Sequence, residues 1–262
     1  MSVYGFLRSP RWIGLGLLMT MLAAVMVGLG FWQLSRFHQR SAINDRIDAG
    51  SSASPVPLSS VLPSTGADPL SSVIWTRVTV TGTYDASHQI LARARTVGDN
   101  VGFEVLTPLV LPSGDAVLID RGWIPPASSG SATAAPSVPA VPPGQVTVTG
   151  RLHAPESRAS APEPFAGGLA VRRIAPSSLA SAVPYPLYGG YVTMDSQVPP
   201  AASVFVQIPA DHENAAMNAG YVVQWWAFAL LTLAGYVYLV RREAHPPLTD
   251  SSFADEAELV AH

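Results

Sequence analysis

The chain has 262 residues, a formal net charge of −3, 48% hydrophobic residues and only 13% charged residues. This composition excludes a disordered tail, and the chain is too long to be only a membrane anchor. The absence of cysteine excludes disulfides, thiolate metal sites and cysteine nucleophiles. All fifteen basic residues are Arg and they form no basic cluster. We therefore expect no nucleic-acid binding, which requires clustered positive charge.

The first long apolar segment is residues 12–35, bounded by Arg11 and Arg36. Its 24 uncharged residues suffice to cross roughly 30 Å of hydrocarbon at about 1.5 Å per helical residue. A cleaved signal peptide is the alternative, but its apolar region is shorter, about 7–15 residues, and leads to a small-residue cleavage site. The segment is therefore predicted to be an uncleaved transmembrane helix that follows a short N-terminus, residues 1–11.

The second apolar segment, residues 221–240, is followed at once by two arginines, whereas acidic residues precede it. By the positive-inside rule this charge difference places the C-terminal tail, residues 241–262, in the cytoplasm. Two spans then place residues 1–11 in the cytoplasm too. The intervening residues 36–220 are predicted to form an extracytoplasmic domain.

Short segments of alternating apolar and polar residues fill most of this domain, and they predict β-strands. Short turns join most of them, which is typical of an antiparallel all-β domain, either a barrel or a sandwich. The expected fold is thus two transmembrane α-helices that enclose an extracytoplasmic antiparallel all-β domain. The predicted strands are 77–84, 89–95, 103–111, 116–124, 145–152, 169–174, 187–194 and 204–208, with a short helix at 177–183.

The connections between these segments differ in composition. Residues 112–115 have the sequence PSGD and predict a hairpin turn, because Gly114 can adopt positive φ. Two longer stretches, 51–72 and 125–143, are rich in Pro, Ser and Ala. Such compositions bury too little apolar surface to offset their ordering entropy, so loosely packed loops are expected there.

The chain shows none of the common catalytic motifs: no G-x-S-x-G, no H-E-x-x-H and no phosphate-binding glycine loop. We therefore expect no enzyme, no catalytic residue and no protein-bound metal ion. The six histidines are scattered, and a surface or packing role is the simplest account of each. His212 differs by position, since it precedes the second span by nine residues and could act as an axial haem ligand near the outer membrane surface.

The string DRGW at 120–123 ends the most apolar predicted strand. One interpretation places Arg121 beside the Trp123 indole, where its guanidinium could hold a carboxylate such as a haem propionate. The other is structural: Arg121 pairs with Asp120 or another carboxylate, Gly122 makes a tight bend, and Trp123 fills the core. Arg93 and Arg95 are two residues apart on one strand and are expected on one solvated face.

Aromatic and amide side chains lie near the outer ends of both spans. If the spans are antiparallel, these residues share a depth, and the amides need partners in the hydrocarbon. Interfacial Trp and Tyr ordinarily form an aromatic belt. The alternative is a flat face that holds a porphyrin or another protein's helix. The residues concerned are Trp32, Gln33, Tyr221, Gln224 and Trp225.

Several strings, in this order, resemble the surfeit-locus family of cytochrome c oxidase assembly factors. They are GFWQLSR at 30–36, the block from RVTVTGTY to DRGWIP at 77–125, YPLY at 185–188 and GYVVQWWAFAL at 220–230. The resemblance covers most of the predicted ordered chain. By motif position, the residues that the resemblance marks as candidate functional positions are Trp32, Gln33, Arg36, Gly82, Arg121, Gly122, Trp123, Tyr221 and Trp225.

The resemblance implies a non-enzymatic factor in a bacterial plasma membrane that helps insert or retain haem A in oxidase subunit I. Haem A is the candidate cofactor, bound transiently, and Arg36, Arg121 and Trp123 are candidate partner-binding residues. The family commonly has a haem-associated His where this chain has Asn218. His212 would then substitute, or packing alone would hold the haem, or the chain would act only on its partner.

Two other functions remain open from the sequence. One is a stable accessory subunit that packs against the oxidase or other respiratory-complex subunits. The other is an unrelated extracytoplasmic binding or sensing domain carried on a helical hairpin. For the β domain itself we expect no small-molecule ligand.

Overall fold

A computed structural model describes residues 4–62, 64–127, 134–210 and 212–245. Most of the C-terminal tail predicted at 241–262 therefore lies outside the described residues. The chain divides into a helical unit, up to residue 42 and from residue 213 onward, and a sheet unit, residues 43–212. The two units are described separately below.

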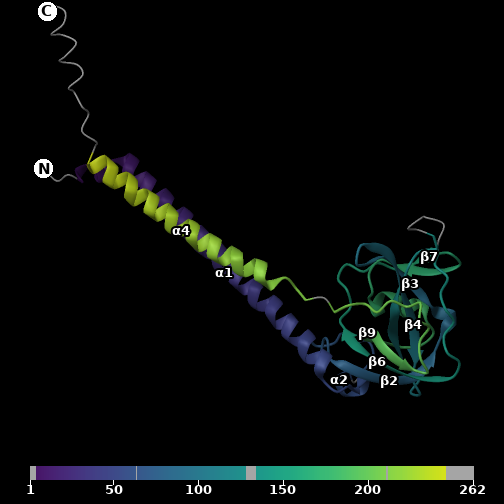
Figure 1. The fold of residues 1–262 in the computed structure, drawn as a ribbon. Helices are drawn as coiled ribbons and strands as arrows, with labels where there is room; N and C mark the ends of the chain where they lie inside the picture. The colour runs from purple at the N-terminus through teal and green to yellow at the C-terminus, as the bar shows by residue number, and fades with distance from the viewer. Residues whose placement is uncertain (1–3, 63, 128–133, 211, 246–262) are drawn as a thin grey trace, which may run out of the picture. The chain divides into compact units, whose positions relative to one another are not determined.

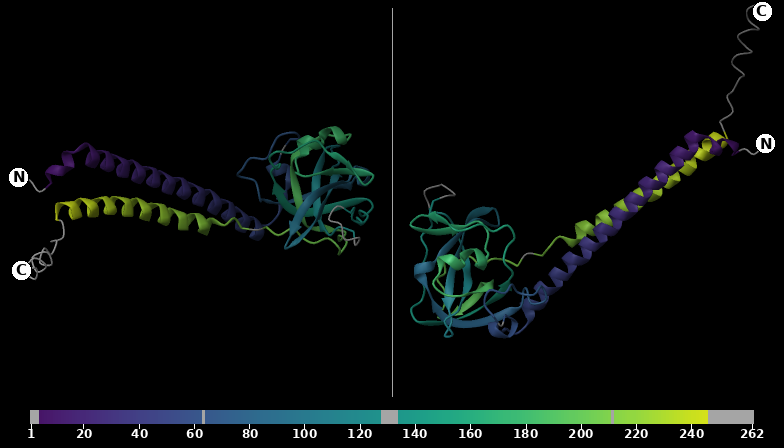
Figure 2. Two further views of the ribbon diagram at one scale, coloured as in Figure 1. Left: turned by 90° about the horizontal axis from the view of Figure 1, so that it is seen from above. Right: turned by 180° about the vertical axis from the view of Figure 1, so that it is seen from behind.

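The helical unit is built from two long helices that run side by side (Figures 1 and 2). They are α1 (Pro10–Ser52), which follows the short helix η1 (Gly5–Arg8), and α4 (Ala215–Ala244). Both are long and apolar enough to cross a membrane. Both predicted spans are therefore confirmed as helices.

Each helix extends beyond the predicted apolar span. Helix α1 continues through residues 36–52, and α4 begins at Ala215, before Tyr221. The Asn214 side chain caps α4 by accepting a hydrogen bond from the Met217 amide at 3.1 Å. The prediction ended each helix where the apolar run ended, but polar residues with adequate helix propensity continue a helix into water.

The described residues of the sheet unit form nine strands in the order β1-β2-β6-β9-β5-β4-β3-β8-β7. Two short α-helices, α2 (Leu58–Val61) and α3 (Pro176–Leu179), and two 3-10 turns, η2 (Ala86–His88) and η3 (Ala180–Ala182), accompany them. The strands are β1 (Val56–Pro57), β2 (Arg77–Tyr84), β3 (Ile90–Val97), β4 (Asn100–Val110), β5 (Ala116–Ile124), β6 (Gln145–His153), β7 (Glu163–Phe165), β8 (Gly168–Val171) and β9 (Leu187–Val198).

The sheet closes on itself because β2 also pairs with β4, through Thr83 opposite Val110 and Tyr84 opposite Leu109. Strands β2, β6, β9, β5 and β4 therefore form a closed ring (Figure 2). The expectation of a purely antiparallel sheet is wrong, since β1–β2, β3–β8 and β5–β9 pair in parallel. Strand β9 lies far along the chain from β5, so the connection has room for the crossover that a parallel pair needs.

Most predicted strands are confirmed within a few residues, and 77–84 and 116–124 have the predicted bounds. The predicted strand 204–208 is wrong: there, only Val206 forms an isolated bridge, to Trp123. Strands β1 and β7 were missed because they are very short. The predicted hairpin turn is confirmed, since Gly114 has φ +89° and the Leu111 amide donates to the Asp115 carbonyl at 2.8 Å.

The string VTVTG occurs in both β2 and β6, and these two strands are direct antiparallel partners. Val80 lies opposite Val148, and Thr81 opposite Thr147. The two threonine hydroxyls lie 2.9 Å apart and form a cross-strand hydrogen bond.

Strand β5 is buried on both faces. Val117 and Ile119 belong to the apolar cluster enclosed by the ring, whereas Leu118 belongs to a second cluster that Leu179 of α3 covers. The expectation of a loose loop at 51–72 is wrong for its α2 part. Leu58 of α2 and the following Leu62 are only 2% and 3% exposed and join the first cluster.

Candidate functional site

The interface of the two long helices contains a buried amide pair. The Asn218 amide donates to Gln33 Oε1 at 2.6 Å, and Asn218 is 6% exposed. The sequence predicted that Gln33 needs a partner in the hydrocarbon, and this contact supplies one. Gln224, the other predicted amide, is exposed and does not join this contact.

The predicted aromatic residues are brought to the helical unit's surface rather than into one cluster. Trp32 is 58% exposed and Tyr221 41% exposed, whereas Trp225 is half-buried and packs edge-on against Phe228. Trp226, which sequence reasoning missed, is an aromatic side chain that does lie at the contact between the two helices.

Trp226 packs directly over Gly30 of α1. A Cβ atom on Gly30 would overlap the indole ring, so only glycine fits there. The same indole meets Phe31 edge-on, with ring centroids 5.6 Å apart. Gly16, Ala23 and Gly30 are spaced seven apart, and this heptad of small residues in α1 could have indicated the contact face.

Polar contacts follow where α1 leaves the apolar segment. Arg40 donates to the Asn214 carbonyl at 3.1 Å and lies 3.6 Å from the Glu213 carboxylate. Arg36, a predicted partner-binding residue, is exposed and donates to Gln39 within its own helix at 3.3 Å. The guanidinium of Arg36 is thus at the surface, where a partner can reach it.

His212, the predicted alternative haem ligand, lies in the sheet unit. Its Nε2 is 2.9 Å from Asp48 Oδ1, and both side chains are more than half exposed. This contact engages one of the two ring nitrogens that can act as an iron ligand.

The DRGW string is buried. Trp123 is 6% exposed and its indole donates to the Arg95 carbonyl at 3.0 Å, so it fills the core as the structural interpretation predicted. Gly122 has φ +125°, which confirms the predicted bend. The predicted ion pair of Arg121 is wrong, because its hydrogen-bond partners among the described residues are all neutral.

A buried charge cluster lies on the other face of β5, and sequence reasoning missed it. Arg95 lies 2.9 Å from Glu104 and 2.8 Å from Glu156, with only 14% of its side chain exposed. The solvated face predicted for Arg93 and Arg95 is therefore wrong for Arg95. A bulge with Ala94 at φ +57° separates the two arginines, and an isolated glutamate in an apolar strand, Glu104, was the available signal.

Burial dominates the ionisation of this cluster. It raises the pKa of Glu104 to about 7, although Arg95 lowers it in part. Burial, together with the nearby Glu104, also raises the pKa of Asp120 well above its usual value. Burial and the repulsion between neighbouring carboxylates therefore both favour the protonated forms of Glu104 and Asp120.

A surface turn brings Asp85, Ser87 and His88 together. The His88 Nδ1 atom lies 2.6 Å from Asp85 and 3.1 Å from the Ser87 hydroxyl. Both partners use one ring nitrogen, whereas a hydrolytic triad needs one on each. The hydrogen bonds from Ser87, His88 and Tyr185 outweigh partial burial and lower the pKa of Asp85 to about 2. Over residues 4–62, 64–127, 134–210 and 212–245, no metal-binding cluster of acidic, His or Cys side chains occurs.

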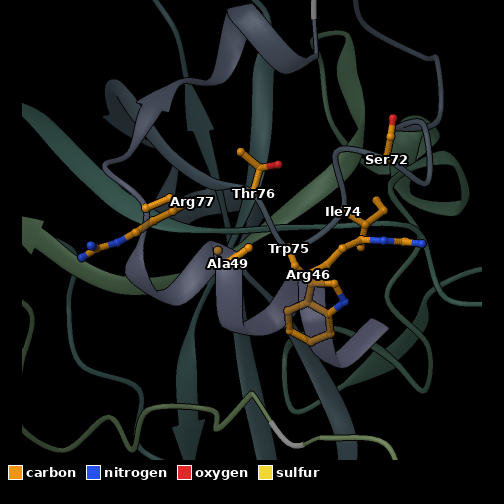
Figure 3. A pocket seen from close by; sticks show the side chains of 9 residues that line it. Arg46, Ala49, Ser72, Ile74, Trp75, Thr76 and Arg77 are labelled. Atoms are coloured by element: carbon orange, nitrogen blue, oxygen red, sulfur yellow. The ribbon is translucent and has the colours of Figure 1, made fainter. Parts of the chain in front are cut away.

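A hollow of about 190 Å³ lies beside the last turns of α1 (Figure 3). Trp75 lines it with φ +73°, an uncommon backbone conformation for a bulky residue. Figure 3 shows Arg46 and Arg77 pointing in different directions. Arg46 donates to the Ser71 carbonyl, and Arg77 lies 3.8 Å from Asp195. The two cations therefore do not converge on one ligand.

A family model described as the SURF1 family matches residues 20–230, which include most of α1, the whole sheet and the first part of α4. This chain belongs to the SURF1 family. SURF1-like proteins of Mycobacterium bovis and Mycobacterium tuberculosis are 32% identical to it over 241 residues, which cover 91% of this chain and 86% of theirs. A SURF1-like protein of Monosiga brevicollis is 32% identical over 132 residues, 46% of this chain and 49% of its own.

Membership in the SURF1 family confirms the resemblance found in the sequence. The family is generally linked to cytochrome oxidase assembly and is a family of assembly factors rather than of known enzymes. The two apolar helices are consistent with a membrane protein.

Proposed function

We propose that this chain is a non-enzymatic membrane assembly factor for a haem-A-containing cytochrome c oxidase, which helps insert or retain haem A in subunit I. The observation that carries the proposal is the family match, because it runs through both helices and the sheet. In this proposal the helices cross a bacterial plasma membrane, both termini are cytoplasmic and the sheet unit is extracytoplasmic.

Exposed aromatic rings on the helical unit support this role. Trp32, Tyr221 and Trp226 are 58%, 41% and 39% exposed and lie near the amide pair. Flat rings at this level can pack against a porphyrin or against an apolar helix of a membrane partner. Asn218 is a poor iron ligand and its amide is engaged by Gln33, so haem A would be held transiently by packing rather than by iron ligation at this position.

Deleting the gene tests the proposal most directly. We expect the deletion to lower both haem A content and oxidase activity in the membranes, and unchanged values would contradict the proposal.

Variants of the full chain test the helical surface. We expect Trp32→Ala and Tyr221→Ala to reduce haem A retention or oxidase association more than two controls do. His88→Ala removes a ring of the sheet unit, and Tyr238→Ala removes an exposed ring near the other end of α4. Equal losses from all four variants would remove the case for this surface.

A second function, a stable accessory subunit of the oxidase or a respiratory supercomplex, is favoured by Asn218. The family resemblance places a haem-associated His at position 218. In this chain Asn218 of α4 is instead hydrogen-bonded to Gln33 of α1. Purification of the oxidase in mild detergent separates the two functions. Stoichiometric co-purification with the mature enzyme supports a subunit, whereas association only with immature complexes supports an assembly factor.

A further inference from the structure

Arg121 is a buried cation without an acidic partner. It is 2% exposed, and no carboxylate of the described chain lies within 4.0 Å of it. The other well-buried arginines of the sheet unit are paired, Arg95 with Glu104 at 2.9 Å and Arg151 with Asp195 at 2.9 Å. A buried charge is costly unless it is paired, so an unpaired guanidinium needs an explanation.

Neutral groups hold this guanidinium weakly. Its Nη atoms donate to Gln89 Oε1 and to the Pro139 and Ala140 carbonyls, all at 3.3 Å. Charge-assisted hydrogen bonds are normally about 2.7–2.9 Å long. The Nε atom is buried without any partner. The guanidinium therefore keeps unused capacity to donate hydrogen bonds.

A hollow of about 210 Å³ opens beside Arg121. Strand β9 forms one wall and the following segment, residues 200–207, forms the other. Phe205 of that segment covers the guanidinium, with the ring centroid 4.7 Å from the Arg121 Cζ atom. The lining side chains are Arg121, Met194, Asp195, Ser196, Gln197, Pro200, Ala201, Ala202, Phe205 and Gln207.

The walls of the hollow are fixed in place. Trp123 and Val206 exchange two backbone hydrogen bonds of 2.9 Å, which attach the outer segment to β5. The Gln207 amide donates to the Asp195 carbonyl at 2.6 Å. The hollow is thus built by contacts within the fold, as in a preformed ligand site.

The charge around the hollow is positive. Asp195 is the acidic side chain among its lining residues, and it is already paired with Arg151 at 2.9 Å and with Arg77 at 3.8 Å. Arg121 therefore adds an uncompensated positive charge. An anion in the hollow would supply the missing partner.

We propose that the hollow beside Arg121 binds a carboxylate group carried on a short apolar stem. A planar carboxylate matches the donors of a guanidinium, and Met194, Ala201 and Phe205 supply apolar contacts for the stem. The volume is below the roughly 300–1,000 Å³ typical of sites for drug-sized ligands, so the group that enters is small. This site departs from the expectation that the sheet unit has no small-molecule ligand, and it does not depend on the proposed function.

Butyrate is the first probe, added to the purified full chain in detergent and followed by ligand NMR. Butyramide has the same shape without the charge. We expect saturable binding of butyrate, and affinity for butyramide weaker by about tenfold or more, because a charged hydrogen bond is lost. Arg121→Gln should weaken butyrate binding by a similar factor. Equal binding of the two probes, or unchanged binding by Arg121→Gln, would overturn the proposal.

A second variant keeps the test valid if Arg121→Gln fails to fold. Ala202 is exposed at the rim of the hollow, so Ala202→Trp should fill the hollow without altering buried packing, and should abolish butyrate binding. Val204→Trp is the matched control, since Val204 is 45% exposed in the same segment but does not line the hollow. Butyrate binding that survives in Ala202→Trp would refute the site.

The carboxylate can belong to a free acid or to a propionate group of a porphyrin. Competition distinguishes these sources. A porphyrin with free propionates should displace butyrate if the porphyrin is the source, whereas its dimethyl ester should not. Failure of both to displace bound butyrate would identify free short-chain acids as the ligand class of the same site.

Discussion

The two faces of β5 treat buried charge in opposite ways. On one face, Arg95 contacts Glu104 and Glu156, and burial raises the pKa of the neighbouring Asp120. On the other face, Arg121 is buried among aromatic rings and neutral carbonyls. Asp120 and Arg121 are adjacent in the chain, yet successive side chains of a strand point to opposite faces. Strand geometry therefore prevents the ion pair between Asp120 and Arg121 that the sequence suggests. The buried charge on each face must be compensated by other groups.

The largest effect is expected when the paired face loses its cation. Arg95→Met should lower the free energy of unfolding of the full chain by about 3–5 kcal/mol, because it leaves buried carboxylates without a partner. Arg121→Met should cost much less, about 1–2 kcal/mol, since no buried carboxylate is orphaned. Denaturant unfolding followed by tryptophan fluorescence measures both. Equal losses would show that the two faces do not differ in this way.

The bend at Gly122, directly after these two residues, is the next test. Gly122→Ala should destabilise the fold by about 2–3 kcal/mol, because φ +125° is strained for alanine and its Cβ would lie 3.0 Å from the Val206 carbonyl oxygen. Gly114→Ala is the control: its φ is +89°, but no atom lies within 4 Å of the added Cβ. We expect the control to lose about 1 kcal/mol. If both variants lose the same free energy of unfolding, crowding against the Val206 carbonyl oxygen does not contribute to the destabilisation by Gly122→Ala.

Stability should also depend on pH through the acidic face. The pKa of Glu104 is raised to about 7, so the folded state binds this proton more tightly than the unfolded state does. The resulting stability is complete below the usual carboxyl pKa and is lost as pH rises through 7. We expect the free energy of unfolding to fall on the order of 2 kcal/mol between pH 5 and pH 8.

Glu104→Gln should reduce the slope of this pH profile, although Asp120, whose pKa is also raised, keeps part of it. Glu163→Gln, which changes a carboxylate with 60% side-chain exposure, should leave the profile intact. The pKa of Asp85 is lowered to about 2, so its contribution is lost only as pH falls below 4 and does not enter this window. A profile that keeps its slope in Glu104→Gln would show that another group carries the proton.

The smallest effect is expected at Asp120. Asp120→Asn should not lower the free energy of unfolding at pH 7 by more than about 1 kcal/mol, because an amide oxygen can still accept from the Gly122 amide. Unlike the buried carboxyl, whose pKa is raised, the amide takes up no proton on folding. The unfolding midpoint of the variant at pH 7 and pH 5 measures this. A loss comparable to that of Arg95→Met would mean that Asp120 is ionised in the folded state.

The sequence predicted the features of the candidate site that depend on neighbouring residues. It missed those that depend on contacts between residues far apart in the chain. Gly122 as a bend, Trp123 as a core residue and Gly114 in a hairpin turn follow from neighbouring residues, and all three are confirmed. The partner of Gln33 was not predictable, because Asn218 lies 185 positions further along the chain. Glu104 was missed for the same reason, since Glu156 comes from a distant loop.

The sequence by itself determined the two apolar helices, most of the strands and the family. These depend on local hydrophobic periodicity and on short motifs, which are legible along the chain. Only the tertiary structure decided that the sheet closes through β2 and β4 and that β5 and β9 run parallel. It also decided that Asp120 and Arg121 never meet. The physical reason is that sheet closure, strand register and charge pairing depend on contacts between residues far apart in sequence. The free energies of such contacts cannot be read from a local sequence pattern.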